Sequence, residues 1–267
     1  MPGDSVLKVS GLSVAFGGIR ALNDVAFTVA PGEIVGLVGP NGSGKSTLLN
    51  AVGNLLRGAQ VSGDVTVLGA SGRRPPEALC RHGVGRSFQS PTLLEDSTLV
   101  ENLLCGAHTS RGGGWLAELV RPKAARAAEG ALRQRALELL NTVSLAEQAW
   151  DLVARKPYGT RKLIDILRAF MTQPRLALLD EPTSGLDGHD RGVVADLLHR
   201  IQGASETAML VVEHHFELLS AVADRVVALA AGQVVLTGTP TQVFESEEFR
   251  TMLTGREQRT REQPCSS

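Results

Sequence analysis

The chain has 267 residues and a mass of 28.2 kDa, enough for one large α/β domain or for one domain with an inserted lobe. Its 27 lysines and arginines against 28 aspartates and glutamates give a net charge of −1, which excludes a global basic field for nucleic acid or anionic lipid. No run approaches about 18 apolar residues and no signal-peptide pattern is present, so we expect a soluble chain. The odd number of cysteines without metal-like spacing favours reduced, inert thiols in the cytoplasm: Cys80, Cys105 and Cys265.

The N-terminal part indicates antiparallel strands that lead into a buried strand. Apolar and polar positions alternate in short runs through residues 7–38, and Gly17-Gly18 and Pro31-Gly32 interrupt them. Residues 33–38 are rich in β-branched side chains, which is typical of a buried strand. Phe16 precedes the first glycine pair. Its ring can stack on an adenine base or fill the end of a strand, and the pattern favours neither.

A glycine-rich loop follows the buried strand directly. Residues 39–47 read Gly-Pro-Asn-Gly-Ser-Gly-Lys-Ser-Thr and satisfy G-x-x-x-x-G-K-[ST], with a helical start behind them. The glycines let backbone N–H groups face a phosphate, the helix N-terminus adds partial positive charge, and Lys45 adds a full one. Ser46 offers a hydroxyl to Mg²⁺. A plain strand-to-helix turn is the alternative, but both flanks favour a nucleotide.

The middle of the chain changes from strand to helical patterning. Residues 62–69 indicate a strand, and residues 83–89 indicate another that ends in Gln89, a residue that alone indicates nothing. From residue 98 to about 153 apolar residues recur at spacings of three and four, with a glycine-rich linker at 109–114. We interpret this segment as an inserted helical lobe, followed by an amphipathic helix at residues 163–170.

Two carboxylates end the next apolar strand. Asp180 and Glu181 follow Leu-Ala-Leu-Leu at residues 176–179. Acidic residues at the carboxyl end of a parallel strand point into the crevice where ligands bind. One can hold Mg²⁺ through water and the other can orient a nucleophilic water. A surface turn is the alternative, and the apolar run argues against it.

The C-terminal part indicates another buried strand at residues 208–213 and a hairpin at 225–236, with a polar tail beyond Arg256. His214 and His215 follow the buried strand, where a histidine can donate to a phosphate oxygen. Either histidine alone is more often an ordinary loop residue.

In order, these segments resemble the aromatic loop, Walker A, Q-loop, signature, Walker B, D-loop and H-loop of ABC-type ATPases over residues 7 to about 240. Within that family, residues 16–18, 83–89, 99–102 and 212–214 are similar to the ATP-binding subunits of branched-chain amino-acid importers. The resemblance implies an α/β fold: a RecA-like P-loop core with an antiparallel β subdomain and an inserted helical subdomain. It implies an ABC ATPase domain at 5–240, a helical subdomain at about 90–165, and a C-terminal helix and polar tail at 241–267.

The resemblance also implies a role for each matched residue. Glu181 would be the general base, and His214 would hold Glu181 and the γ-phosphate together. Ser184 to Asp187 would form the D-loop that crosses the subunit interface. The metal ligands would be Ser46, Gln89 and Asp180, the last through the water shell. The nucleotide would be bound by Phe16, Asn41, Gly42, Ser43, Gly44, Lys45, Ser46, Thr47, Gln89, Tyr158, Gly159 and Asp187, with Lys45 also catalytic.

The implied ligands are ATP and Mg²⁺, and the implied partners are other protein chains. In this family two nucleotide domains sandwich two ATP molecules, so we expect a second ABC ATPase subunit, as a heterodimer or a homodimer. Integral-membrane permease subunits would dock between Gln89 and the helical lobe, and a substrate-binding protein would act indirectly. No nucleic acid is expected. Leu93 and Leu94 would either contact the permease or be buried in the lobe.

The implied function is an ATP hydrolase that powers import of branched-chain or related amino acids from the cytoplasmic face of the cell membrane. Alternatives are an ABC ATPase of a urea, amide or lipid transporter, a soluble non-transport ABC ATPase, and a nucleotide switch that does not hydrolyse ATP.

Two motifs depart from the family pattern. The signature is commonly L-S-G-G-Q, and residues 156–160 here place Pro157 at the serine position, which removes a hydroxyl and an N–H. Gly159 can still face the partner's phosphate, and Lys156 could add charge. The departure predicts either a slower ATP site in a heterodimer or neutral variation. His215 stands where aspartate is common, and we expect it on the surface.

Overall fold

A computed structural model describes residues 5–107 and 122–253. The chain divides into two compact units, one of residues 1–73 with 210–267 and the other of residues 74–209. Among the described helices, none has the length and apolar character needed to span a membrane. Three predicted features lie outside the described residues: the linker at 109–114, the tail beyond residue 256, and Cys265.

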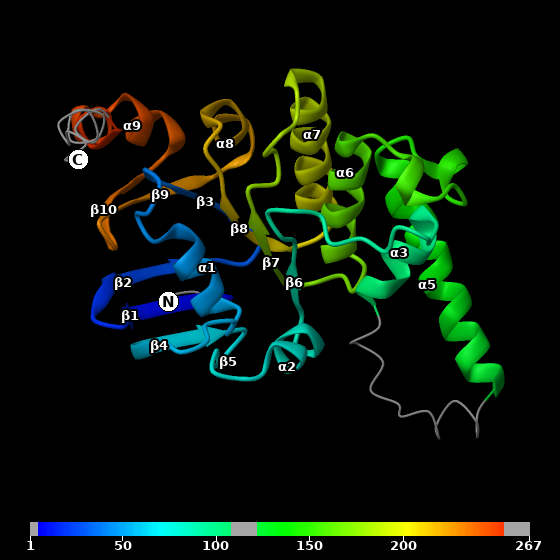
Figure 1. Cartoon of the computed structure of the whole chain (residues 1–267), viewed down its shortest axis with the longest axis horizontal. Helices are drawn as coiled ribbons and strands as arrows, with labels where there is room; N and C mark the ends of the chain where they lie inside the picture. The colour runs from blue at the N-terminus through cyan, green and yellow to red at the C-terminus, as the bar shows by residue number, and fades with distance from the viewer. Residues whose placement is uncertain (1–4, 108–121, 254–267) are drawn as a thin grey trace, which may run out of the picture. The chain divides into compact units, whose positions relative to one another are not determined.

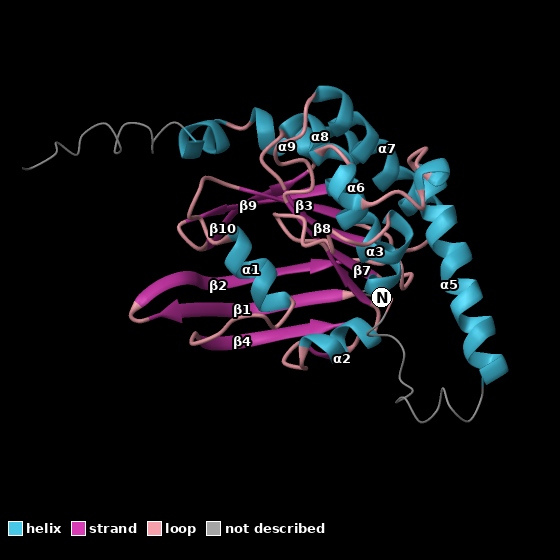
Figure 2. Ribbon diagram, turned by 45° about the vertical axis from the view of Figure 1, so that its right-hand side comes forward, coloured by secondary structure: helices cyan, strands magenta, loops and turns pink. Residues whose placement is uncertain are grey.

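The first unit begins with an antiparallel sheet of strand order β2-β1-β4-β5. Figure 2 shows β2, β1 and β4 side by side. β1 (Leu7–Phe16) pairs with β2 (Ile19–Val29) on one side and with β4 (Gln60–Val67) on the other, and β5 (Ala70–Ser71) is short. Apolar side chains alternate into a buried face, as the pattern predicted. The glycine pair at 17–18 has positive φ angles of 52° and 91° in the turn.

A second sheet of this unit has β3 (Ile34–Val38) in a fully buried position. It pairs in parallel with β9 (Arg225–Ala230), and β9 continues into the antiparallel β10 (Gln233–Gly238). Asp224 accepts a hydrogen bond from the N–H of Ile34 (2.8 Å). The predicted hairpin at 225–236 is therefore confirmed, and its first strand lies against the strand that leads into the glycine-rich loop.

The helices of the described part of this unit are α1 (Lys45–Val52), α8 (Phe216–Val222) and α9 (Pro240–Glu245), and residues 247–253 are helical as well. α1 is the predicted helix after the glycine-rich loop. α8 is too short for its apolar period to stand out in the sequence. It buries Leu218 and Leu219.

In the second unit β6 (Val84–Arg86) pairs in parallel with β7 (Leu176–Asp180). The N–H of Ala208, the first residue of β8 (Ala208–Val212), donates to the carbonyl oxygen of Arg175 (3.0 Å). The boundary between the two units falls within β8: residues 208–209 belong to the second unit and residues 210–212 to the first. The prediction of a strand up to Gln89 was wrong, because β6 ends at Arg86. From Phe88 onward, the backbone N–H and C=O groups form hydrogen bonds with the side chains of Asp165 and Lys162 instead of with a strand.

Among the helices of this unit, α3 packs against α5 and α6 (Figure 1). Thr98 and Glu101 form a capping box at the start of α3. α6 begins at Tyr158, earlier than the predicted 163, because Pro157 at the N-cap fits a helix start. The bounds are α2 (Pro76–Arg81), α3 (Leu99–Gly106), α5 (Pro122–Thr142), η2 (Ala146–Gln148), η3 (Val153–Arg155), α6 (Tyr158–Ala169) and α7 (Gly188–Ala204).

The predicted fold class is confirmed by these elements together with the structural comparisons below. An antiparallel sheet, a parallel P-loop sheet and a helical lobe are all present. The predicted domain limits at 5–240 and about 90–165 remain predictions.

Candidate functional site

The glycine-rich loop of the first unit is a tight turn between β3 and α1. Gly39 has a φ of 146°, and a Cβ there would lie 2.1 Å from the carbonyl oxygen of Leu229. Gly44 has a φ of 106°, and a Cβ there would lie 2.7 Å from the carbonyl oxygen of Ala21. Only glycine fits these two positions, so the loop backbone is held close against β2 and β9.

Lys45 folds back along this loop. Its side chain is 6% exposed, and its ammonium donates to the carbonyl oxygens of Gly39 (2.7 Å) and Pro40 (3.1 Å). The hydroxyl of Ser43 is buried with no hydrogen-bond partner among the described residues. Ser46 lies exposed in the first turn of α1. A positive charge, a helix N-terminus and spare donors at one turn suit a phosphate group.

His214 follows β8, whose carboxyl end lies beside that of β3. The N–H of Glu213 donates to the carbonyl oxygen of Leu37 (3.4 Å). The buried carboxylate of Glu213 then accepts from the N–H groups of His214 (2.7 Å) and His215 (3.2 Å). Glu213 therefore fixes the turn that carries His214. His214 is exposed, whereas His215 is half-buried, so the expected surface position of His215 was only partly right.

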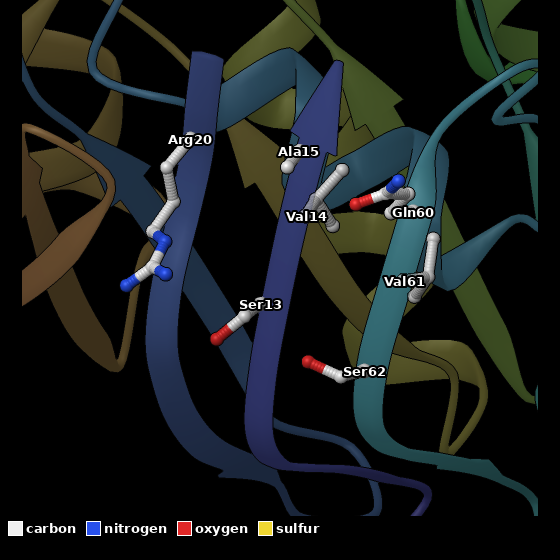
Figure 3. Close-up of a pocket in the computed structure, with 7 residues that line it drawn as sticks. All are labelled: Ser13, Val14, Ala15, Arg20, Gln60, Val61 and Ser62. Atoms are coloured by element: carbon white, nitrogen blue, oxygen red, sulfur yellow. The ribbon is translucent and has the colours of Figure 1, made fainter. Parts of the chain in front are cut away.

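Phe16 ends β1 and is 36% exposed, so its ring is accessible to a ligand. A hollow of about 240 Å³ lies on the same sheet, next to the strand end that carries Phe16 (Figure 3). Within it, Arg20 extends along its own strand to the side chain of Asn23 (2.9 Å). No motif in the sequence indicated this hollow, which is lined by Ser13, Val14, Ala15, Arg20, Gln60, Val61 and Ser62.

In the second unit, the parallel strands β6 and β7 bring three predicted residues to one edge. The amide Nε2 of Gln89 donates to Oε2 of Glu181 at 2.8 Å. Asp180, at the end of β7, lies 4.0 Å from the guanidinium of Arg86. Burial lowers the pKa of Arg86, while Asp180 acts in the opposite direction. Arg86 was not among the predicted site residues.

Glu181 has a left-handed backbone, with a φ of 46°. Non-glycine residues adopt this conformation at a cost of about 1–3 kcal/mol, and such strain concentrates at functional sites. The turn after it is closed by a hydrogen bond from the N–H of Ser184 to the carbonyl oxygen of Glu181 (3.1 Å). This sharp turn places the carboxylate beside Gln89.

The signature residues contact the D-loop within the same unit. A Cβ at Gly185 would lie 2.9 Å from the ring of Tyr158, whose hydroxyl lies 3.5 Å from the carbonyl oxygen of Ser184. A Cβ at Gly159 would lie 2.1 Å from the carboxylate of Asp190. A side chain at residue 159 would therefore displace the carboxylate of Asp190.

Two further residues have local partners. The carboxylate of Asp187 accepts from the N–H of Asp190 (2.8 Å) and caps the start of α7. The ammonium of Lys156 donates to the side chains of Gln148 (2.6 Å) and Asp151 (2.7 Å). The suggestion that Lys156 adds charge at a phosphate is thus not supported by its geometry.

The donor set suits Mg²⁺. This ion prefers oxygen ligands and is usually held by one or two carboxylates together with phosphate oxygens and water. In the second unit, Asp180 and the side-chain oxygen of Gln89 are ligands of this kind. In the first unit, the hydroxyl of Ser46 is another. The described residues contain no group of three or more His, Cys, Asp or Glu side chains that could hold a metal by themselves.

A family model described as "ABC transporter" matches residues 22–184 of the chain. The chain belongs to the ABC transporter family. Among its relatives is BraF of Pseudomonas aeruginosa, a high-affinity branched-chain amino acid transport ATP-binding protein. The two are 31% identical over 252 residues, which cover 91% of this chain and 95% of BraF. The predicted family and enzyme class are thereby confirmed: the chain is an ATP-hydrolysing subunit of an ABC transporter.

Solved structures of ABC cassettes have the same fold. The ADP conformation of an ATP-binding cassette of an ABC transporter has a TM-score of 0.78 and 27% identity, and covers 94% of this chain and 99% of the cassette. A dimeric post-hydrolysis cassette bound to ADP and Pi has a TM-score of 0.72 and 26% identity, and covers 88% and 98%. ABC ATPases work as dimers with membrane permease subunits, and they bind nucleotide.

Proposed function

We propose that this ABC ATPase powers the import of branched-chain or related amino acids. The similarity to BraF over nearly the whole of both chains supports the substrate class. The contact of Gln89 with Glu181 at the edge of β7 is the observation that carries the hydrolytic role. The chain would be bound peripherally at the cytoplasmic face of the membrane through permease subunits, with a substrate-binding protein on the other side.

Each site residue then has a chemical task. The loop at 39–47 and Lys45 bind the phosphates, and Phe16 stacks on the adenine. Ser46, Gln89 and Asp180 would hold Mg²⁺, which would supply positive charge to the phosphate oxygens when bound. Glu181 accepts a proton from the attacking water, and His214 orients the terminal phosphate. Catalysis here consists mainly of positioning and charge neutralisation, because phosphoryl transfer needs little covalent help.

The function is tested by isolating the chain from membranes with its native partners. We expect integral-membrane permease subunits to co-purify. In vesicles, we expect the complex to transport leucine, isoleucine or valine only when ATP is present on the side of the membrane on which this chain lies. Uptake of an unrelated solute instead would reject the substrate class but retain the ATPase. Isolation without any permease would reject the transport role.

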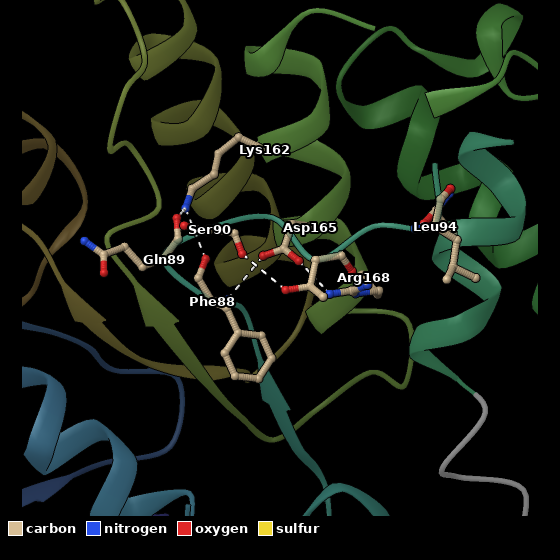
Figure 4. A network of polar contacts seen from close by, with 9 residues as sticks. Phe88, Gln89, Ser90, Leu94, Lys162, Asp165 and Arg168 are labelled. Atoms are coloured by element: carbon tan, nitrogen blue, oxygen red, sulfur yellow. Dashed lines mark hydrogen bonds and ion pairs between the residues drawn. The ribbon is translucent and has the colours of Figure 1, made fainter. Parts of the chain in front are cut away.

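Two apolar side chains support the proposed permease contact. Leu94 is 54% exposed and Phe88 is 40% exposed, both on the segment that follows β6. Leu94 is therefore not buried in the helical lobe, which was the alternative left open by the sequence. Figure 4 shows the two side chains apart on this segment, so each is a separate candidate point of contact.

Replacing Lys45 with alanine should weaken ATP binding by roughly 10- to 150-fold, because a hydrogen bond to a charged group contributes about 1.5–3 kcal/mol. Equilibrium binding of a fluorescent ATP analogue measures the effect. Lys8→Ala is the matched control, since Lys8 is an exposed residue of β1. Unchanged affinity in Lys45→Ala would remove Lys45 from the phosphate site.

Replacing Pro157 with serine should raise the ATPase rate of the complex if the proline makes one ATP site slow. Serine restores a hydroxyl and an N–H, each a donor for the partner's phosphate. A gain of roughly 10-fold or more is expected from one charge-assisted hydrogen bond made in the transition state. Pre-steady-state turnover, counted per ATP site, shows whether one site is slow. An unchanged or lower rate would mean that the substitution is neutral variation and would remove the argument for unequal sites in a heterodimer.

A further inference from the structure

Two charged residues of α6 are completely buried. Lys162 and Asp165 are both 0% exposed, and they lie three residues apart on one face of the helix. Charged side chains are almost never fully buried unless they are paired or hydrogen-bonded. Their partners therefore indicate what these two residues do.

Lys162 binds the backbone of Phe88 and Gln89, and Asp165 binds the backbone of Phe88 (Figure 4). The ammonium of Lys162 donates to the carbonyl oxygens of Phe88 (3.1 Å) and Gln89 (2.5 Å). The carboxylate of Asp165 accepts from the N–H of Phe88 (3.2 Å). Two charges of opposite sign thus hold both polar groups of one residue, which leaves its peptide planes little freedom to turn.

Arg168 extends this network along the loop. Its guanidinium donates to Asp165 (2.6 Å) and to the carbonyl oxygen of Thr92 (2.6 Å). Burial raises the pKa of Asp165, and Arg168 and Lys162 oppose that effect. The loop is thereby fixed to α6 at Phe88, Gln89 and Thr92.

The far end of the same loop is fixed to α3. Asn102 is 0% exposed, accepts from the N–H of Leu94 (2.8 Å) and donates to the carbonyl oxygen of Leu94 (3.1 Å). Residues 88–94 are therefore held by the helical lobe at both ends. The side chain of Gln89 leaves this segment and reaches Glu181 after β7.

We propose that Lys162 and Asp165 are positioning residues for Gln89, holding its backbone so that its amide meets the carboxylate of Glu181. The proposal rests on the functions given above to Gln89 and Glu181. Because α6 starts with the signature residues Tyr158 and Gly159, a displacement of this helix carries Gln89 with it. Events at the signature, which faces one ATP, are thereby transmitted to the base that acts on the other.

The test is a double-mutant cycle on the ATPase rate of the full chain with its partner subunits. Lys162→Met removes the ammonium at similar length, and we expect kcat to fall roughly 10- to 100-fold with little change in KM for ATP. Gln89→Ala should lower kcat as well. The double variant should be no slower than Gln89→Ala, because Lys162 acts through Gln89.

Ile166→Ala is the matched control, since Ile166 is equally buried on α6 and is apolar. In the double variant Ile166→Ala/Gln89→Ala, the fold reductions in kcat of the two single variants should multiply, as expected for a residue that contributes only packing. If the effects of Lys162→Met and Gln89→Ala also multiply, Lys162 has a structural role and the proposal fails.

A measurement independent of ATPase activity accompanies the cycle. Asp165→Ala removes the acceptor for the N–H of Phe88, and we expect hydrogen exchange at that amide to rise at least roughly 10-fold while the amides of β7 remain protected. Unchanged exchange at Phe88 would overturn the proposal. A wild-type complex without ATPase activity would instead refute the proposed function, and the exchange experiment would still decide whether α6 holds the loop.

Discussion

Replacing Glu181 with glutamine is expected to lower ATP turnover by roughly 100- to 10 000-fold, the usual contribution of a general base. Glutamine has nearly the same shape but cannot accept a proton from water. Its carbonyl oxygen can still accept the hydrogen bond that Gln89 donates to Glu181 at 2.8 Å. The site should therefore keep its geometry and lose only the proton acceptor.

ATP should still bind to the Glu181→Gln variant, and the closed dimer should persist because hydrolysis no longer opens it. Single-turnover kinetics measure the chemical step, and size-exclusion chromatography with ATP measures the dimer. Glu206→Gln is the control, since Glu206 is exposed on a loop of the same unit. Turnover within about 10-fold of wild type in Glu181→Gln would assign the base to another group.

Replacing Gly39 with alanine should abolish nucleotide binding and lower the free energy of unfolding by roughly 2–4 kcal/mol. The new Cβ would lie 2.1 Å from the carbonyl oxygen of Leu229, a backbone atom of β9 that has no room to move. The φ of 146° is also one that alanine rarely adopts. The loop must therefore leave its path, and its N–H groups no longer face the phosphates.

Thermal denaturation and ATP-analogue binding check this result together. Gly192→Ala is the control, because Gly192 lies inside α7 with no atom within 4 Å of an added Cβ. This variant should bind nucleotide normally and be more stable by up to about 1 kcal/mol, since alanine favours a helix. Wild-type affinity in Gly39→Ala would show that the phosphate site does not depend on this backbone path.

The contiguous motifs could be predicted because their chemistry is local. The loop at 39–47 and the carboxylates at 180 and 181 each follow an apolar strand, so their position at the end of that strand can be inferred from pattern alone. The signature helix was predicted too short because Pro157 was not recognised as its N-cap. The helices α2 and α8 were missed because six or seven residues hold too few turns for a clear period.

The sequence by itself determined the phosphate loop and the two carboxylates at the end of an apolar strand. The resemblance of its ordered motifs to ABC-type ATPases supplied the family, the fold class, and the candidate base and metal ligands. Only the tertiary structure decided that Gln89 meets Glu181 across 92 residues of sequence, that Glu213 fixes the turn of His214, and that Lys162 and Asp165 hold the loop of Gln89. The physical reason is that a buried charge is stable only where its partners converge. Those partners come from helices and strands that are distant in the sequence. The local spacing of apolar residues does not indicate how such elements pack together.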